Sequence, residues 1–413
     1  MKMNKSYIKY VVALGIVFLS INLTGQELET YIQQALESNL EIQQIETQYK
    51  RVLEKQNEVN TLPNTEVGVG VFVSSPETRT GAQKFKVSVK QMLPFFGTIT
   101  ARENYASSLA DVTYQDIVIK KRNIVASVSQ SYYTLYEIKA KQAVLDDNIE
   151  LLATYEKLAL TSVEVGKASA VDVLKLQIRQ NELKQKKEVL QETFLAEQAF
   201  FNKLLNRKTL EEVVLVNRLE MPKKVEVVAA EGLKLHPELI KYDRLFASVE
   251  KSEVLNQKQR NPMLGFGLDY INVEKRPDMT FDDNGKDILM PMVSVSIPIF
   301  NKKYTSISKQ HKLQQDEVLT QKQQRLNSLE AKLQKAISNR NTAFIKFKTQ
   351  QQNFNQAKNA QNILIKSYET GTIDFNDVLD IQELQLKFQM NMITSSVDYY
   401  NHTVTIHYLT PQN

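Results

Sequence analysis

The sequence predicts a mainly α-helical fold with a small β part, built as two structural repeats. The segments "VEVGKASAVDVLKLQ" and "YETGTIDFNDVLDIQ" match at a constant offset of 205 residues, from Gly166 to Gly371 and from Asp172 to Asp377. A fixed offset over several positions indicates internal duplication. From Ile99 to the first of these glycines the chain has no proline, which is typical of one very long helix.

Composition favours long helices over a loop-rich fold. The 413 residues include only 12 glycines and 10 prolines and no tryptophan or cysteine, whereas Gln, Asn, Lys and Glu are abundant. The absence of cysteine excludes a disulfide framework, a thiolate metal site and a lipid anchored on cysteine. The formal charge of +5 includes three lysines of residues 1–25, so the remaining chain is near +2 and does not indicate a nucleic-acid partner.

Residues 1–25 have the layout of a secretory signal peptide. Lys2, Lys5 and Lys9 precede the apolar segment "VVALGIVFLSI", and "NLTG" ends in a small residue suited to cleavage after Gly25. The alternative is a membrane anchor, but the apolar segment is short against the roughly 20 residues that a span needs. We expect export and removal of this segment.

The duplication divides the mature chain at about residue 225. We expect a first repeat over 26–225, with a helix, a β-hairpin at 65–93 and long helices that turn near residue 166. We expect a second repeat over 226–413, with a helix, a hairpin at 264–300 and a turn near residue 371. Gly68 and Gly70 match Gly265 and Gly267 at an offset of 197 residues, which supports the equivalence of the two hairpins.

The hairpin strands alternate strictly between apolar and polar residues. Val87 and Val89 lie on one face of a strand, and Lys84, Lys86 and Lys90 lie on the other. Segments of about ten residues with this period are typical of transmembrane β-strands, and equally of a half-buried soluble sheet. Four strands are fewer than the roughly eight of a membrane barrel, and open edges are not tolerated in lipid. Either the sheet is soluble or several chains share one barrel.

With the duplicated glycine turns, the doubled hairpins and the "ALESN" start at residues 35–39, the chain resembles the outer-membrane efflux protein family, of which TolC is the best-known member. The resemblance covers essentially the whole mature chain. It implies a long α-helical barrel in the periplasm of a Gram-negative bacterium, continued by a transmembrane β-barrel in outer-membrane lipid that three protomers complete.

The function implied by the resemblance is a passive exit duct of a tripartite efflux system. The implied partners are two further copies in a homotrimer, a periplasmic adaptor protein and an inner-membrane pump of the resistance-nodulation-division type. The cargo would be small molecules or metal ions. Two alternatives stay open, namely the channel of a type I protein secretion system and a secreted coiled-coil structural or adhesion protein.

The resemblance also assigns site residues by position. The pore constriction would be lined by Asp374, Asp377 and Asp380, and the closed gate would be held by Tyr368 and Asp172. Asp172 and Asp377 can also be read as helix caps. The expected adaptor contacts lie in the two turns, at Val165, Gly166, Lys167, Thr370, Gly371 and Thr372.

One position departs from the family pattern. The family has an arginine two residues after the second turn glycine, where this chain has Ile373, so the charge lock between helices is in question unless Lys167 replaces it.

No motif for catalysis or cofactor binding is present, so we expect neither an enzyme nor a cofactor. The sequence lacks G-x-S-x-G, H-E-x-x-H and the phosphate-binding loop, and its four histidines show no metal-ligand spacing. Met290 and Met292 could suit a soft metal, but packing in the lumen or at an interface is the simpler reading, and no metal site is expected.

Overall fold

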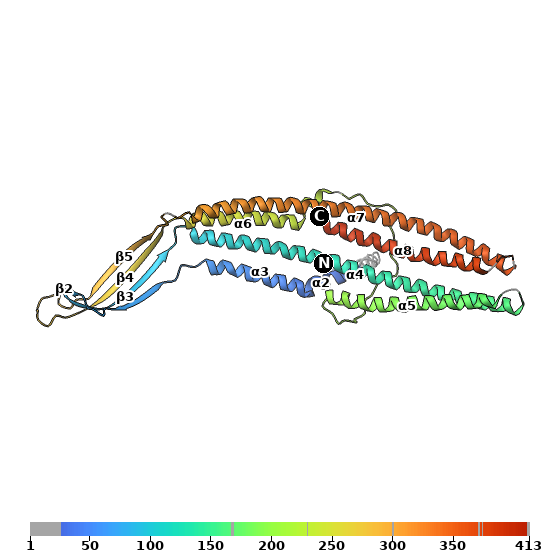
Figure 1. Ribbon diagram of the computed structural model, residues 1–413, viewed down its shortest axis with the longest axis horizontal. Helices are drawn as coiled ribbons and strands as arrows, with labels where there is room; N and C mark the ends of the chain where they lie inside the picture. The colour runs from blue at the N-terminus through green and yellow to red at the C-terminus, as the bar shows by residue number, and fades with distance from the viewer. Residues whose placement is uncertain are drawn as a thin grey trace, which may run out of the picture. The chain divides into compact units, whose positions relative to one another are not determined.

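The computed structural model describes the chain from Gln26 to Thr410, apart from residues 167–168, 229, 300, 371 and 374 (Figure 1). The expected signal segment, 1–25, therefore lies outside the described residues. The helices are α2 (Gln26–Ser38), α3 (Leu40–Val59), α4 (Thr98–Glu164), α5 (Ala170–Leu204), the 3₁₀ helix η1 (Ala230–Leu235), α6 (Pro237–Gln259), α7 (Lys303–Glu369) and α8 (Phe375–Leu409). The strands are β1 (Glu66–Val71), β2 (Glu77–Thr78), β3 (Gly81–Leu93), β4 (Met263–Glu274) and β5 (Ile288–Ser296).

The order of elements repeats along the chain, with matching helix lengths. Helices α4 and α7 each have 67 residues, and α5 and α8 each have 35. One ion pair is repeated as well: Lys120 contacts Glu41 at 2.8 Å, and at the equivalent positions Arg325 contacts Glu238. A duplicated contact between duplicated helices is difficult to explain except by an internal repeat. Over the described residues, no helix combines the length and the hydropathy that a membrane crossing requires.

The described chain divides into two compact units, one of residues 26–43, 119–236 and 327–410 and the other of residues 44–118 and 237–326. Each unit takes segments from both sequence repeats. The second unit contains the sheet, and the first contains the turns at the ends of α4 and α7.

The sheet is antiparallel, in the order β1-β3-β4-β5, with the short β2 added to β3 (Figure 1). In this order β1 and β5 form the two edges. The register places Val69 opposite Val87, and Val87 opposite Tyr270. Cross-strand partners share a face, so one face of the sheet, the apolar face, consists mainly of valine, leucine and aromatic side chains. These residues are Val67, Val69, Val71, Phe85, Val87, Val89, Leu264, Phe266, Leu268, Tyr270, Leu289, Val293 and Val295.

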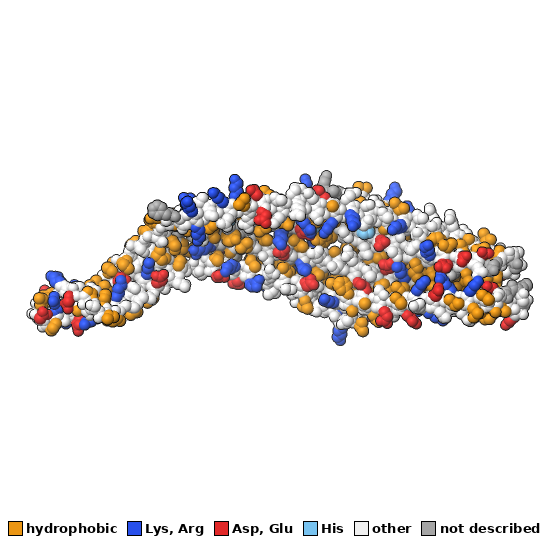
Figure 2. All heavy atoms as spheres, in the orientation of Figure 1, with side chains coloured by type: hydrophobic (Ala, Val, Ile, Leu, Met, Phe, Trp, Pro, Cys, Tyr) orange, Lys and Arg blue, Asp and Glu red, His pale blue; other side chains and the backbone are white. Residues whose placement is uncertain are grey.

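The opposite face, the polar face, carries charged, small and thioether side chains. Lys86 lies on it and forms an ion pair with Asp269, whose side chain is fully buried. Lys84 likewise contacts Glu274 on the neighbouring strand. The row of lysines that is visible in the sequence is therefore largely neutralised by acids of β4. In the view of Figure 2, further charged side chains gather at the hairpin tips, beyond the strands.

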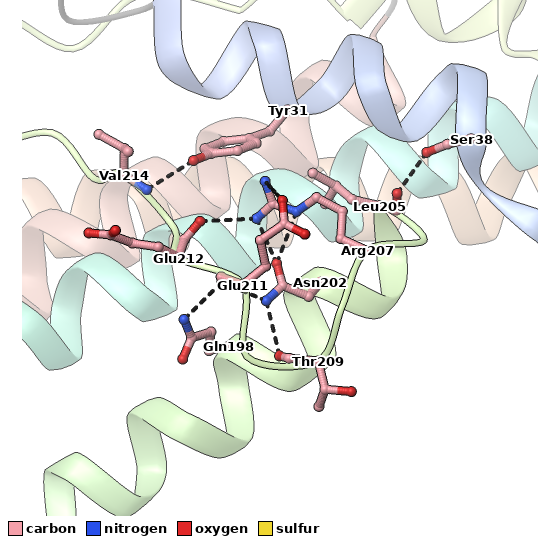
Figure 3. A network of polar contacts seen from close by, with 10 residues as sticks. All are labelled: Tyr31, Ser38, Gln198, Asn202, Leu205, Arg207, Thr209, Glu211, Glu212 and Val214. Carbon is pink, nitrogen blue, oxygen red and sulfur yellow. Dashed lines mark hydrogen bonds and ion pairs between the residues drawn. The ribbon is translucent and has the colours of Figure 1, made fainter.

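In the first unit, three buried tyrosines hold the segment that follows α5 against the helices (Figure 3 shows the first of them). The hydroxyls of Tyr31, Tyr132 and Tyr136 accept hydrogen bonds from the backbone N–H groups of Val214, Val216 and Leu219, at 2.9, 3.0 and 3.0 Å. Burial raises the pKa of Tyr132 to about 12, so its hydroxyl stays neutral at physiological pH.

Asn202 organises the start of the same segment (Figure 3). Its side-chain amide donates to the carbonyls of Thr209 and Glu211 at 3.0 and 2.8 Å, and its oxygen accepts from Arg207 at 2.6 Å. The guanidinium of Arg207 in turn lies 5.1 Å from the centre of the Tyr31 ring, within range of a cation–π contact. The end of α5 is thereby fixed by polar contacts that are shielded from water.

Asn39 joins α2, α3 and α5. Its side-chain oxygen accepts hydrogen bonds from the N–H groups of Glu41 and Ile42, which caps α3, and its amide donates to the carbonyl of Leu204 at 2.7 Å. The Asn39 side chain is buried, so water could not replace its hydrogen bonds to these backbone groups if the side chain were removed.

We predict that Asn39→Ala lowers the free energy of unfolding by about 2–4 kcal/mol, because it removes a cap and strands a buried carbonyl. Asn57→Ala is the matched control, since Asn57 is exposed and bonds only to Glu54 among the described contacts. Chemical denaturation followed by circular dichroism measures both variants. Equal stability of the two would contradict the assigned role of Asn39.

Candidate functional site

The first turn of the candidate site ends α4. The N–H of Val165 bonds to the carbonyl of Thr161 and that of Gly166 bonds to Val163, at 3.3 and 3.0 Å. Gly166 has φ +70°, a left-handed conformation that favours glycine, and no atom lies within 4 Å of the position that a Cβ would take. Val165 is 63% exposed, so this turn presents an apolar side chain to its surroundings. Lys167 lies outside the described residues.

The second turn ends α7 with a different pattern. The N–H of Thr372 reaches back to the carbonyl of Ser367 at 3.0 Å, the six-to-one bond of a Schellman helix end. The hydroxyls of Thr370 and Thr372 donate to the same carbonyl at 2.9 and 2.8 Å. Both threonines are exposed. Gly371 and Asp374, two of the predicted site residues, lie outside the described residues.

Asp172 forms the capping box of α5. The side chain of Ser169 accepts from the N–H of Val171 at 3.2 Å, and the Asp172 carboxylate accepts from the N–H of Ser169 at 3.4 Å. This is the reciprocal arrangement that satisfies two free donors at a helix start. The geometry therefore supports the cap reading of Asp172 over a gate contact within the protomer.

Tyr368 packs at the base of the second turn. Its ring lies edge-on to Phe375 with ring centres 4.8 Å apart, and Phe375 in turn contacts the ring of Tyr155. The Tyr368 hydroxyl is buried and has no hydrogen-bond partner among the described residues. Ile373 packs on the same hydrophobic cluster, so this position of the second turn contributes an apolar contact.

Asp377 and Asp380 are exposed on the first turns of α8. They lie three residues apart, away from Phe375 and Val378, which are buried on the opposite side of the helix. The structure thus presents both carboxylates on one open face. In this position they are available to solvent, to ions or to another chain.

A polar bridge between α5 and α8 was not predicted from the sequence. Arg179 contacts Glu383 at 3.1 Å and Glu182 at 2.8 Å, and Lys175 donates to Asn376 at 2.7 Å. These residues line a cleft of about 280 Å³ that also includes Asp380. The only sequence signal is the basic pair at 175 and 179, which a helical period places on one face of α5.

No protein-family model and no curated protein matches the sequence. Among solved structures, the CusC channel has a TM-score of 0.78 at 12% identity, with 96% of both chains covered. CmeC of Campylobacter jejuni has a TM-score of 0.74 at 13% identity, covering 93% of this chain and 85% of CmeC. VceC of Vibrio cholerae has a TM-score of 0.72 at 13% identity, covering 93% of this chain and 96% of VceC.

This chain has the TolC-like fold. The fold class expected from the doubled hairpins and long helices is confirmed. The TolC-like fold accounts for the equal lengths of α4 and α7, since each repeat supplies one long helix, one hairpin and one shorter return helix.

The cap assignment of Asp172 can be tested by separating its charge from its hydrogen-bonding capacity. We predict that Asp172→Asn keeps the first turn of α5 intact, because the amide oxygen can still accept from Ser169. Asp172→Ala should weaken that turn by about 1 kcal/mol. Hydrogen exchange of the amides at residues 169–173 measures this difference. If Asp172→Asn exchanged as fast as Asp172→Ala, an acceptor oxygen at this position would not protect the turn, and the cap reading would be wrong.

Proposed function

We propose that the chain is the outer-membrane exit duct of a tripartite efflux system, a passive and non-enzymatic channel for small molecules or metal ions. The observation that carries the proposal is the sheet, which has one exposed apolar face, one polar face and two edges that have no partner strand among the described residues. The following steps lead from this sheet to the duct.

The apolar face suits lipid. Val67, Val69 and Val71 are 68%, 72% and 74% exposed, and Val293 is 72% exposed. A contiguous exposed surface of branched aliphatic side chains is costly in water and stable in hydrocarbon. The polar face, with Lys86, Ser88 and Asp269, then lines an aqueous lumen.

The edges suit further copies of the chain. Within the described residues, β1 pairs only with β3, and β5 pairs only with β4. Backbone groups without partners are not tolerated in lipid, so the edges must close into a barrel. Three copies of the path β1-β3-β4-β5 would give about twelve strands, a number above the minimum of roughly eight for a membrane barrel. A homotrimer is therefore our proposed assembly.

The helices offer surfaces for the same assembly. Large exposed apolar side chains are most frequent on α5, where Val171, Leu174 and Ile178 are 53%, 57% and 60% exposed. On α7, Ile345 and Ile363 are 64% and 65% exposed. Lateral packing of α5 from one copy against α7 of the next would bury both sets.

At the turns, Asp377 and Asp380 fit a carboxylate ring. In a trimer, three copies of an exposed pair brought to one opening concentrate negative potential and attract cations. Asp374 would join them if it shares that face. We assign the pore constriction to these residues and the gate packing to Tyr368.

The turns themselves are the proposed contact with a periplasmic adaptor, at Val165, Gly166, Lys167, Thr370, Gly371 and Thr372. Energy would come from an inner-membrane pump, which we propose to be of the resistance-nodulation-division type. No nucleotide or cofactor is needed in the duct itself.

Planar-bilayer recording of the purified protein tests the duct. We predict small, mostly closed pores that prefer cations, and a weaker preference in the double variant Asp377→Ala, Asp380→Ala. Glu188→Ala, Glu192→Ala is the matched control, since it removes two exposed carboxylates from α5. Reversal potentials in a salt gradient measure the preference. An unchanged reversal potential in the aspartate variant would reject the ring, and an absence of pores would reject the duct.

A further inference from the structure

The methionines of the sheet all lie on one face. The four methionines within the described strands, Met92, Met263, Met290 and Met292, share the polar face. The register shows this directly, because Met92 lies opposite Gly265, Met290 opposite Asp269, and Met292 opposite Gly267. Met263 is two residues from Gly265 on the same strand. The apolar face has no methionine, although thioethers and branched aliphatics would serve equally well against lipid.

The glycines of β4 leave space for these side chains. The sulfur of Met92 lies 2.5 Å from the position that a Cβ on Gly265 would occupy. The terminal methyl group of Met292 lies 3.4 Å from the equivalent position on Gly267. Two thioether side chains therefore extend over adjacent glycines of the central strand, from the strands on either side. A larger residue at either glycine would displace them.

The methionines remain accessible in this position. Met290 and Met292 are each 38% exposed, and Met92 and Met263 are partly exposed. Ile271, Val273 and Ile288 lie on the same face but toward the hairpin tips. The thioethers thus form a group in the half of the sheet nearer to the helices.

The basic charge on this face is balanced in part by acids. Lys86 is neutralised by Asp269, and Lys90 lies opposite Glu66 in the register. The chain has no cysteine, so no thiolate competes for a soft ion. Its four histidines lie outside the strands.

We propose that Met92, Met263, Met290 and Met292 form a binding surface for soft monovalent cations, Cu(I) or Ag(I). Thioether sulfur is a soft ligand that selects such ions over hard divalent cations. Flexible methionine side chains can bring two or three sulfurs to one ion without moving the strands. The inference rests on the proposed duct, because the duct makes this face the lining of a lumen through which ions pass.

Silver binding to the purified full chain tests the site. Silver nitrate in chloride-free buffer is the probe, and bound metal is measured by titration calorimetry and by elemental analysis after gel filtration. The test variant replaces Met92, Met263, Met290 and Met292 by leucine, a nearly volume-conserving change. The control variant replaces Met221, Met279, Met390 and Met392 by leucine, so it removes the same number of thioethers from outside the strands.

We expect the wild type and the control variant to bind about one or more silver ions per chain. The strand variant should bind silver about tenfold more weakly or not at all. The site would be overturned if the wild type bound no silver. It would also be overturned if the strand variant and the control variant bound silver with equal affinity.

Bilayer recording of the same preparations keeps the two proposals apart. A wild type that conducts but binds no silver would leave the duct intact and remove the metal surface. A wild type that forms no pores would reject the duct, whatever its silver binding.

Discussion

The two edge strands of the sheet impose the main constraint on how this protein can assemble. Within the described residues, β1 and β5 each have a partner on one side only, and the apolar face between them is exposed. Both features favour association with another chain or with lipid. The edge strands have unpaired backbone N–H and C=O groups, and the exposed valines are costly in water. The proposed closure by further copies in lipid would satisfy both at once. It would also bury the exposed apolar side chains of α5 and α7.

The proposed closure would also explain the composition of the polar face. Gly68, Gly70, Gly265 and Gly267 all lie on it. A Cβ on Gly68 would approach the Ser88 hydroxyl to 2.8 Å, and one on Gly265 would approach that of Ser294 to 2.3 Å, so this face is already crowded. Glycines on the concave side allow a sheet to curve, and the same lack of side chains makes room for the methionines. In the proposed barrel, the curvature, the lining of the lumen and the placement of the methionines would all depend on these glycines.

Much of the fold could be predicted from the sequence, because the signals were local or repeated. The strict alternation at Val87 and Val89 and the duplicated turn glycines needed no tertiary information, and Gly166 has the positive φ that a helix reversal favours. Contacts between distant residues could not be predicted in this way. The bond from Val214 to Tyr31 spans 183 residues, and the Arg179–Glu383 bridge joins two repeats. The neutralisation of Lys86 could not be predicted either, because Asp269 lies opposite Ser88 in the register and reaches Lys86 diagonally across the strands. The packing of Ile373 on the cluster around Phe375 likewise required the structure.

Disulfide crosslinking between the two sheet edges tests the central claim most directly. The chain has no cysteine, so Val69→Cys on β1 can be combined in turn with Leu289→Cys, Val293→Cys or Val295→Cys on β5, without background. The account predicts oxidation to covalent species of two and three chains in the outer-membrane fraction, with three as the upper limit. Single-cysteine variants on one edge alone should give no closed trimer. Protein that stays monomeric for every pair, or that is recovered only in soluble fractions, would contradict a barrel completed by copies of this chain.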